Sequence, residues 1–242
     1  MISLETIKEL SEKFQSPQAN IIREYLQHLF LSHFYQKRES ENILFKGGTA
    51  LRIIYGSPRF SEDLDFSSKN FLNKKRIESL FIDTLSEISK ENIEVELKEA
   101  KFTSGGYLGI LSYNLYDFKN EIFFEVSFRK KERLKKEIIT IVSDYLPSYI
   151  LVYLASEEIV KEKFLAVLKR KKPRDYYDLY FILRHPVLNK YLPKDALRKI
   201  KENLPKEEIN FKRELSILLP VSHHHILKNF KDVLISEIEK LL

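Results

Sequence analysis

The sequence predicts an α+β fold with an α/β-like beginning, in which a mixed β-sheet with flanking helices precedes an all-helical part. Residues 43–55 read as a short apolar strand, a glycine turn and a helix. Residues 93–129 alternate apolar and polar side chains around a glycine turn, which is typical of a hairpin followed by another strand. From Ser156 onward the apolar spacing is helical, so strands are expected only in the first part.

The same patterns place each element along the chain. They predict helices over 4–14, 20–36, 49–55 and 71–90, and strands over 43–46, 63–67, 93–103, 107–115 and 120–129. Residues 138–142 read as an edge strand or a switch between the two parts. Further helices are predicted over 156–171, 174–185, 193–203, 206–218 and 226–242. We therefore expect two domains, residues 1–147 and 148–242, divided near Pro147.

Composition limits the kind of protein this can be. A chain of 242 residues with 43% hydrophobic residues can bury a sizeable core. The absence of cysteine excludes disulfides and thiolate zinc sites. No run approaches the ~18 apolar residues that span a bilayer, and the first residues lack a basic-then-apolar signal pattern. We expect a cytoplasmic protein with no membrane partner. The net charge of +6 is modest and by itself indicates only a solvated surface.

The chemistry is predicted by the segment from Lys46 to Ser67. Gly47 and Gly48 open a helix, where backbone N–H groups form a site for anions. Asp63 and Asp65 alternate with apolar residues, so both carboxylates face one side of a strand. Two adjacent carboxylates repel each other unless a cation lies between them. A phosphate turn beside paired aspartates indicates Mg²⁺-dependent phosphoryl or nucleotidyl transfer.

Four stretches of sequence resemble the motifs of a known family. Lys-Gly-Gly-Thr-Ala-Leu at 46–51 and Arg-Phe-Ser-Glu-Asp-Leu-Asp-Phe at 59–66 are similar to the active-site motif of the AbiEii-type toxins. These toxins are a branch of the polymerase-β-like nucleotidyltransferases. Residues 158–166 and 170–179 resemble the family's downstream motifs, in the same order. The motifs and the segment between them cover about the middle half of the chain.

The resemblance implies a set of metal ligands. Asp63 and Asp65 would bind Mg²⁺ or Mn²⁺, and Glu125 would be the third carboxylate on a neighbouring strand. An acid between Phe124 and Val126 in an apolar strand needs a partner. A metal pair would supply one, and a salt bridge to Arg129 or a lysine is the alternative.

The resemblance also implies residues that act on the nucleotide. Lys163 aligns with the family lysine that reaches the triphosphate, whereas Lys161 points elsewhere. The phosphates of the NTP would be bound by the turn and by the residues before the aspartates: Lys46, Gly47, Gly48, Thr49, Arg59 and Ser61. Arg59 and Ser61 would alternatively orient the carboxylates.

Asp175 and Asp178 belong to an Arg-Asp-x-x-Asp element at a helix start. Acids in a first turn also favour the helix dipole, so helix capping is the alternative role. The family pattern places Asp175 in the active cleft, completed by the helical domain. Asp178 would support it or hold Arg170 or Arg174.

The implied reaction is transfer of a nucleoside monophosphate from an NTP to a hydroxyl, by the toxin of a toxin–antitoxin or phage-defence pair with a cognate antitoxin protein. Because some relatives modify the 3′ end of tRNA, the resemblance implies tRNA as the leading acceptor. The basic runs at 130–136 and 169–172 adjoin the proposed site and slightly favour RNA. The alternatives are a protein hydroxyl, a small-molecule acceptor, or an inactive module that binds NTP or RNA.

Overall fold

The chain folds into two compact units. The computed structural model describes residues 1–69, 74–129 and 134–242. Unit 1 comprises Met1–Gly56 and Phe60–Leu154, and unit 2 comprises Ser57–Arg59 and Ala155–Leu242. The division after Leu154 lies later than the one expected near Pro147, because a strand following that proline pairs within the sheet of unit 1.

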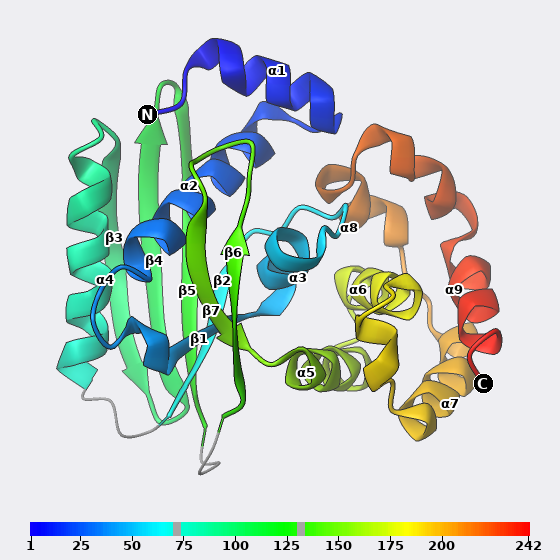
Figure 1. The fold of residues 1–242 in the computed structure, drawn as a ribbon. Helices are drawn as coiled ribbons and strands as arrows, with labels where there is room; N and C mark the ends of the chain where they lie inside the picture. The colour runs from blue at the N-terminus through cyan, green and yellow to red at the C-terminus, as the bar shows by residue number, and fades with distance from the viewer. Residues whose placement is uncertain (70–73, 130–133) are drawn as a thin grey trace. The chain divides into compact units, whose positions relative to one another are not determined.

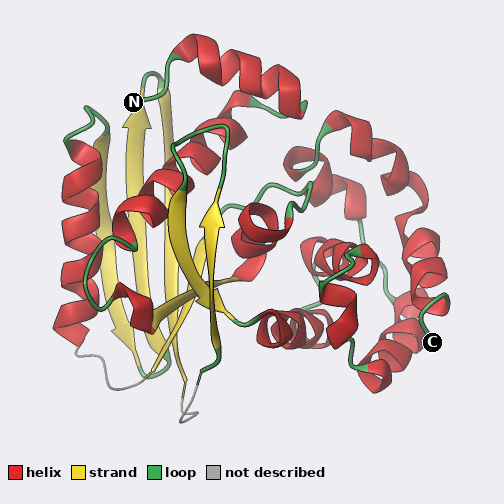
Figure 2. Ribbon diagram, viewed as in Figure 1, coloured by secondary structure: helices red, strands yellow, loops and turns green. Residues whose placement is uncertain are grey.

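Unit 1 contains the described strands and the helices that pack on them (Figures 1 and 2). Its helices are α1 (Leu4–Phe14), α2 (Gln18–Phe34), α3 (Gly47–Tyr55) and α4 (Lys74–Ser89). Its strands are β1 (Ile43–Lys46), β2 (Leu64–Lys69), β3 (Glu94–Thr103), β4 (Gly106–Leu115), β5 (Phe118–Arg129), β6 (Lys136–Ile141) and β7 (Tyr149–Leu154). The expected helix over 71–90 is observed from Lys74, and residues 71–73 lie outside the described part of the chain.

The strands of unit 1 form one mixed sheet in the order β3-β4-β5-β2-β1-β7-β6. β2 runs parallel to β5, and β1 runs parallel to β7, whereas the other neighbours are antiparallel. The mixed sheet and the α+β class are therefore confirmed. The two strands that carry the predicted carboxylates, β2 and β5, lie side by side at its centre.

An aromatic core lies on one face of this sheet. Phe30 of α2 packs against Phe124 of β5 with ring centroids 4.5 Å apart, and Phe81 of α4 contacts the same ring at 5.3 Å. Phe34 of α2 packs against Phe66 of β2 at 5.6 Å. Because side chains alternate along a strand, the residues next to Phe66 and Phe124 face the other side of the sheet.

β7 is the element that the sequence patterns did not predict. Its residues, Tyr-Ile-Leu-Val-Tyr-Leu, form a short run rich in β-branched and aromatic residues shortly after Pro147. That composition is typical of a buried strand and was a usable signal. The strand is mostly buried because β1 and β6 flank it.

In its described residues unit 2 contains helices and no strand. It contains α5 (Ser156–Lys169), α6 (Pro173–Arg184), α7 (Lys194–Asn203), α8 (Phe211–Leu218) and α9 (Phe230–Glu239). α6 is at its core, since Tyr177 stacks on Phe230 of α9 and Tyr176 meets Phe211 of α8 edge to face. No helix in the described ranges is long and apolar enough to cross a membrane.

Candidate active site

Gly47 begins α3 and lies directly against the Asp65 carboxylate. Its φ of +89° lies in the left-handed region that favours glycine, and a Cβ here would be 2.1 Å from Asp65 Oδ2. The Asp65 carboxylate therefore lies at the N-terminus of a helix, where a negative charge is stabilised. The sequence predicts that this glycine turn binds phosphate. In the structure, its missing Cβ leaves room for the Asp65 carboxylate.

Lys46, Asp65 and Glu125 form one row across three adjacent strands. Lys46 pairs with Asp65 between β1 and β2, and Asp65 pairs with Glu125 between β2 and β5. Residues paired across a sheet point to the same face, here the face opposite the aromatic core. The sheet therefore brings together three of the predicted site residues that are far apart in sequence.

A second polar row lies next to this one. Ser67 and Ser127 are paired across β2 and β5, two residues beyond Asp65 and Glu125. Lys46 Nζ donates to Ser127 Oγ at 2.8 Å, and the Lys46 side chain is buried. Lys46 thus reaches along the sheet to Ser127. This row was not identified from the sequence, although Ser67 directly follows the aspartate motif.

Glu125 is exposed, whereas the sequence suggested an acid in an apolar strand that needs a partner. β5 alternates, with Phe124 and Val126 buried on the core face and Phe123 and Glu125 on the other. The carboxylate is not a buried charge that requires a partner. What favours a role for Glu125 is its register with Asp65.

Asp63 lies just before β2 and is held through its backbone. Thr49 of α3 is fully buried, and its hydroxyl donates to the Asp63 carbonyl oxygen. The carbonyls of Ser61 and Glu62 accept bonds from Gln27 of α2. Thr49 and Ser61, both predicted to bind phosphate, are thus engaged in shaping the segment that carries Asp63. Gln27 was missed by sequence reasoning.

The carboxylates fit a magnesium ion by type of donor. Within the described residues, no group of three or more histidine, aspartate or glutamate side chains is gathered in the way that would hold a metal, so Asp63, Asp65 and Glu125 do not form a closed cage. Mg²⁺ is usually held by one or two carboxylates, with waters and substrate phosphates completing its coordination. Asp65 and Glu125 lie on strands that are about 4.8 Å apart, as neighbouring strands are. Such an open set of oxygen donors suits Mg²⁺.

In unit 2, Asp178 is the centre of a buried cluster formed with Arg59 and Lys163. Arg59 Nε donates to Asp178 Oδ1 at 2.8 Å and its Nη2 to Oδ2 at 3.1 Å, while Lys163 Nζ donates to Oδ2 at 2.7 Å. Lys161 instead pairs with Glu157 and Glu158 at the surface.

The charges of this Asp178 cluster stabilise one another. Burial by itself would raise the pKa of Asp178, but Arg59 and Lys163 hold it below its usual value. Burial by itself would lower the pKa of Arg59, but the negative charge of Asp178 raises it above its usual value. Asp178 therefore carries its negative charge between two cations.

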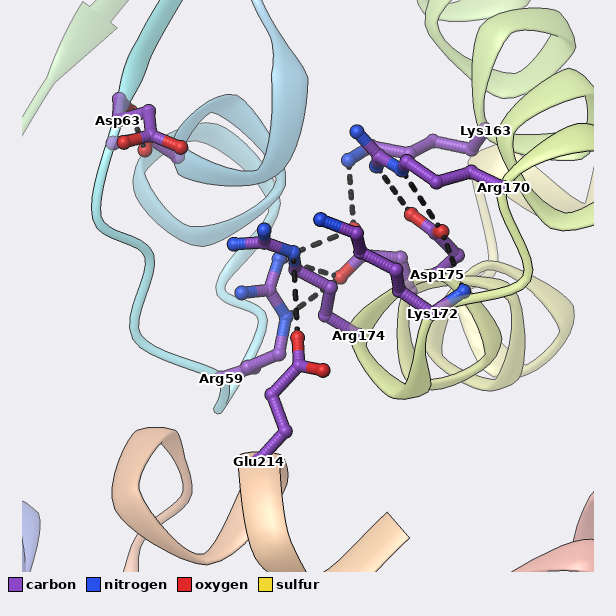
Figure 3. A network of polar contacts seen from close by, with 10 residues as sticks. Arg59, Asp63, Lys163, Arg170, Lys172, Arg174, Asp175 and Glu214 are labelled. Atoms are coloured by element: carbon purple, nitrogen blue, oxygen red, sulfur yellow. Dashed lines mark hydrogen bonds and ion pairs between the residues drawn. The ribbon is translucent and has the colours of Figure 1, made fainter. Parts of the chain in front are cut away.

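Asp175 has the capping geometry that was the alternative role for it. It is fully buried, and its Oδ2 accepts from the Lys172 backbone N–H at 3.0 Å at the start of α6. Its carboxylate also pairs with Arg170, as Figure 3 shows. Arg174 pairs with Glu214 of α8 at 3.3 Å. Asp178 binds Arg59 and Lys163, two partners that the sequence did not predict, while Arg170 pairs with Asp175 and Arg174 with Glu214.

The basic run at 169–172 is divided by these pairs. Arg170 pairs with Asp175 and Lys171 with Glu207, whereas Lys169 and Lys172 are exposed and make no ion pair with a described side chain. In the other basic run, Lys130 to Arg133 lie outside the described residues.

A surface groove of about 1020 Å³ lies away from the predicted residues. It is lined by β3, β4 and β5, including Glu94, Lys98, Asn114 and Glu121. Its polar side chains pair with one another, Lys98 with Glu121 and Asn114 with Glu94. We assign no site to it.

Comparison with known proteins places the chain in a family. The sequence pattern of the family described as "Nucleotidyl transferase AbiEii toxin, Type IV TA system" matches residues 29–237. The chain belongs to the AbiEii family. It is therefore a nucleotidyltransferase of a toxin family, for which an antitoxin partner and an NTP substrate are implied.

Solved structures share the AbiEii fold at low sequence identity. A nucleotidyltransferase described as putative, from H. pylori, is 20% identical with a TM-score of 0.65, covering 93% of this chain and 95% of its own. JHP933 from Helicobacter pylori is 20% identical with a TM-score of 0.62, covering 93% of each chain. MenT4, a nucleotidyltransferase toxin from Mycobacterium tuberculosis H37Rv, is 18% identical with a TM-score of 0.62, covering 93% of this chain and 84% of its own. No curated protein matched the sequence.

Proposed function

We propose that this AbiEii-family chain transfers a nucleoside monophosphate from an NTP to a hydroxyl of RNA, with tRNA as the leading acceptor, in a Mg²⁺-dependent reaction. The acceptor hydroxyl gives up its proton to solvent and its oxygen forms a bond to the α-phosphorus. The bond from the α-phosphorus to the oxygen that bridges it to the β-phosphorus breaks, and pyrophosphate leaves. The observation that carries the proposal is the row of Lys46, Asp65 and Glu125 beside the glycine-led start of α3.

The carboxylates and the cations have separate parts in this reaction. Asp63 and Asp65, with Glu125 in register, would hold the metal, which when bound offsets the charge developing on the phosphate oxygens. Lys163 supplies positive charge for the triphosphate, and Asp178 keeps its ammonium fixed at 2.7 Å. Arg59 shares the same carboxylate and is a positioning residue in this scheme.

The decisive experiment identifies the product. The chain is incubated with each labelled NTP, Mg²⁺ and total RNA, and the labelled macromolecule is identified. Asp63→Asn and Asp65→Asn should fold and lose on the order of 10²–10³-fold in rate, as expected when a group that stabilises transition-state charge is removed. Label on protein instead of RNA would move the acceptor to a protein hydroxyl. Near-wild-type turnover by either variant would refute the carboxylate assignment.

Lys163 can be tested through binding alone. Lys163→Ala should weaken NTP affinity in the presence of Mg²⁺, while Arg59 continues to neutralise Asp178. Lys161→Ala is the matched control, because it lies on the same helix and pairs with surface glutamates. Equal NTP affinity of the two variants would give Lys163 a purely structural role.

The RNA acceptor is supported by the two exposed lysines of the 169–172 run. Lysines that contact phosphates release counterions, so RNA binding should fall with salt with a log–log slope of about −0.7 per phosphate. Lys169→Glu with Lys172→Glu should reduce both RNA labelling and this slope. Lys199→Glu, an exposed lysine of α7, is the control. Flat salt dependence, or unchanged labelling by the double variant, would exclude this surface as the RNA contact.

A further inference from the structure

Helix α2 carries a stripe of polar side chains that is buried. Asn20, Arg23, Glu24, Gln27 and His28 recur at the spacing of one helix face, and all are at most 9% exposed. Further along the same helix, Phe30 and Phe34 pack in the aromatic core. Buried polar groups are costly unless they are hydrogen-bonded, so the partners of this stripe indicate what it is for.

Several partners of the stripe lie on the Asp63 segment or on α3. Glu24 binds Arg52 of α3 through Nε at 2.6 Å and also accepts from Tyr145 at 2.7 Å. The Arg52 guanidinium lies 4.0 Å from the ring centroid of Phe60, at the start of the segment that leads to Asp63. The stripe therefore fixes the helix that begins at Gly47 and the entry to the aspartate strand.

Gln27 bonds directly to that segment, which we call the Asp63 loop (Phe60–Asp63). Its Nε2 donates to the Ser61 carbonyl at 3.0 Å and to the Glu62 carbonyl at 3.2 Å, so both amide hydrogens are used on consecutive residues. Gln27 is 2% exposed, so water cannot readily replace it. Arg23, one turn earlier, lies 3.7 Å from the Glu62 carboxylate. With the Thr49 bond to Asp63, the loop is held from two helices.

We propose that Gln27 is a positioning residue, which acts through the Ser61 and Glu62 carbonyls to set the Asp63 carboxylate relative to Asp65 for metal binding. The inference rests on the proposed function, since it assigns the metal to these carboxylates. The physical reason is that a pair of bonds on two successive carbonyls fixes the direction of the chain entering Asp63. Groups that orient metal ligands typically change metal affinity by about 10–100-fold when they are removed.

The test compares Gln27→Leu with Asn20→Leu in the full chain. Asn20 is in the same stripe at 4% exposure, and its Nδ2 donates to Ser16 Oγ at 3.0 Å, whereas Gln27 Nε2 donates to the Asp63 loop. Both substitutions delete a buried amide of α2, so they control for loss of stability, which is followed by urea unfolding. Two readouts independent of turnover are measured: amide hydrogen exchange of residues 60–63, and Mn²⁺ binding from the electron paramagnetic resonance signal of free Mn²⁺.

Gln27→Leu should speed exchange in the Asp63 loop and weaken Mn²⁺ binding roughly tenfold or more, whereas Asn20→Leu should change neither. If Gln27→Leu fails to fold, Thr49→Val removes the other bond to the loop and should show the same two changes. Faster exchange with unchanged Mn²⁺ affinity, or no difference from Asn20→Leu, would overturn the inference. Absence of Mn²⁺ binding by the wild type would instead refute the proposed function, and exchange would still report whether Gln27 holds the loop.

Discussion

At the residue scale, Gly47 combines two separate requirements. Its positive φ strains any other residue, and its missing Cβ leaves room for the Asp65 carboxylate. Gly56 has only the first requirement, because its φ is +75° and a Cβ added there would meet no atom of the described residues within 4 Å. The two glycines therefore allow the effect of strain to be separated from the effect of close approach.

We predict that Gly56→Ala lowers the free energy of unfolding by about 1 kcal/mol through the left-handed conformation alone. Gly47→Ala should cost more, about 1–3 kcal/mol for strain with the displacement of Asp65 in addition, and should abolish nucleotide transfer. Urea unfolding and transfer assays on both variants check this. Equal losses of stability and activity would show that the close approach to Asp65 has no functional effect.

Asp178 is the second residue whose environment makes a clear prediction. Asp178→Asn keeps the shape but leaves Arg59 and Lys163 buried without their counter-charge, so stability should fall by about 3–5 kcal/mol. Asp195→Asn, an acid with a 91% exposed side chain, should change it by less than about 0.5 kcal/mol. Because Asp178 has a lowered pKa, its contribution is present at neutral pH and is lost on acidification through that folded-state pKa. Comparable unfolding curves for the two variants would contradict the buried-cluster description.

At the scale of elements, the side chains of β5 that pack in the core alternate with side chains on the face that carries the proposed site. Phe124 and Val126 face the core, and Glu121 and Glu125 lie on the other face, four residues apart. Glu125 is in register with Asp65, whereas Glu121 pairs with Lys98 at the surface. A change at Glu125 should therefore affect the reaction and not the fold.

We predict that Glu125→Gln changes the free energy of unfolding by less than about 0.5 kcal/mol and lowers the rate of transfer by about 10²-fold. Glu121→Gln should leave the rate unchanged. Initial rates at saturating NTP and Mg²⁺ measure the effect. Full activity of Glu125→Gln would exclude Glu125 as a metal ligand, and Asp63 and Asp65 would remain as the proposed ligands.

The elements also show what sequence patterns can and cannot predict. Strand–turn–helix order, the hairpin and the helical second half followed from local periodicity, and most bounds agree within a few residues. The buried stripe of α2 could not be predicted in this way. Gln27 and Glu24 look like solvent-exposed polar residues until the loop and helix that cover them are known. The partners of Asp178 also lay outside sequence reasoning, since Arg59 is 119 residues away along the chain.

At the scale of the whole molecule, a buried histidine links stability to pH. His28 Nδ1 lies 2.8 Å from the Tyr149 hydroxyl, and burial lowers its pKa from 6.5 to about 4, with Arg52 also lowering it and Glu24 opposing the shift. The unfolded chain binds a proton at higher pH than the folded chain. Stability should therefore fall as pH drops from 6.5 to about 4.

We predict that this histidine accounts for about 3 kcal/mol of the loss over that range. His28→Gln should flatten the dependence of unfolding free energy on pH there, whereas His225→Gln, at an exposed position, should not. Urea unfolding at a series of pH values measures both slopes. Parallel slopes for His28→Gln and the wild type would show that His28 is not the group that titrates.

Ser57–Arg59 belong to unit 2 although they lie early in the sequence, which limits how the chain can be divided. Three residues encoded within the first half belong physically to the helical unit, where Arg59 meets Asp178. A gene fragment beginning at Ala155 would encode Lys163 and Asp178 without their arginine. Recombination that exchanged the helical half alone would pair a foreign Asp178 with a resident Arg59. The helical unit therefore needs residues from two separate parts of the sequence to complete the Asp178 cluster.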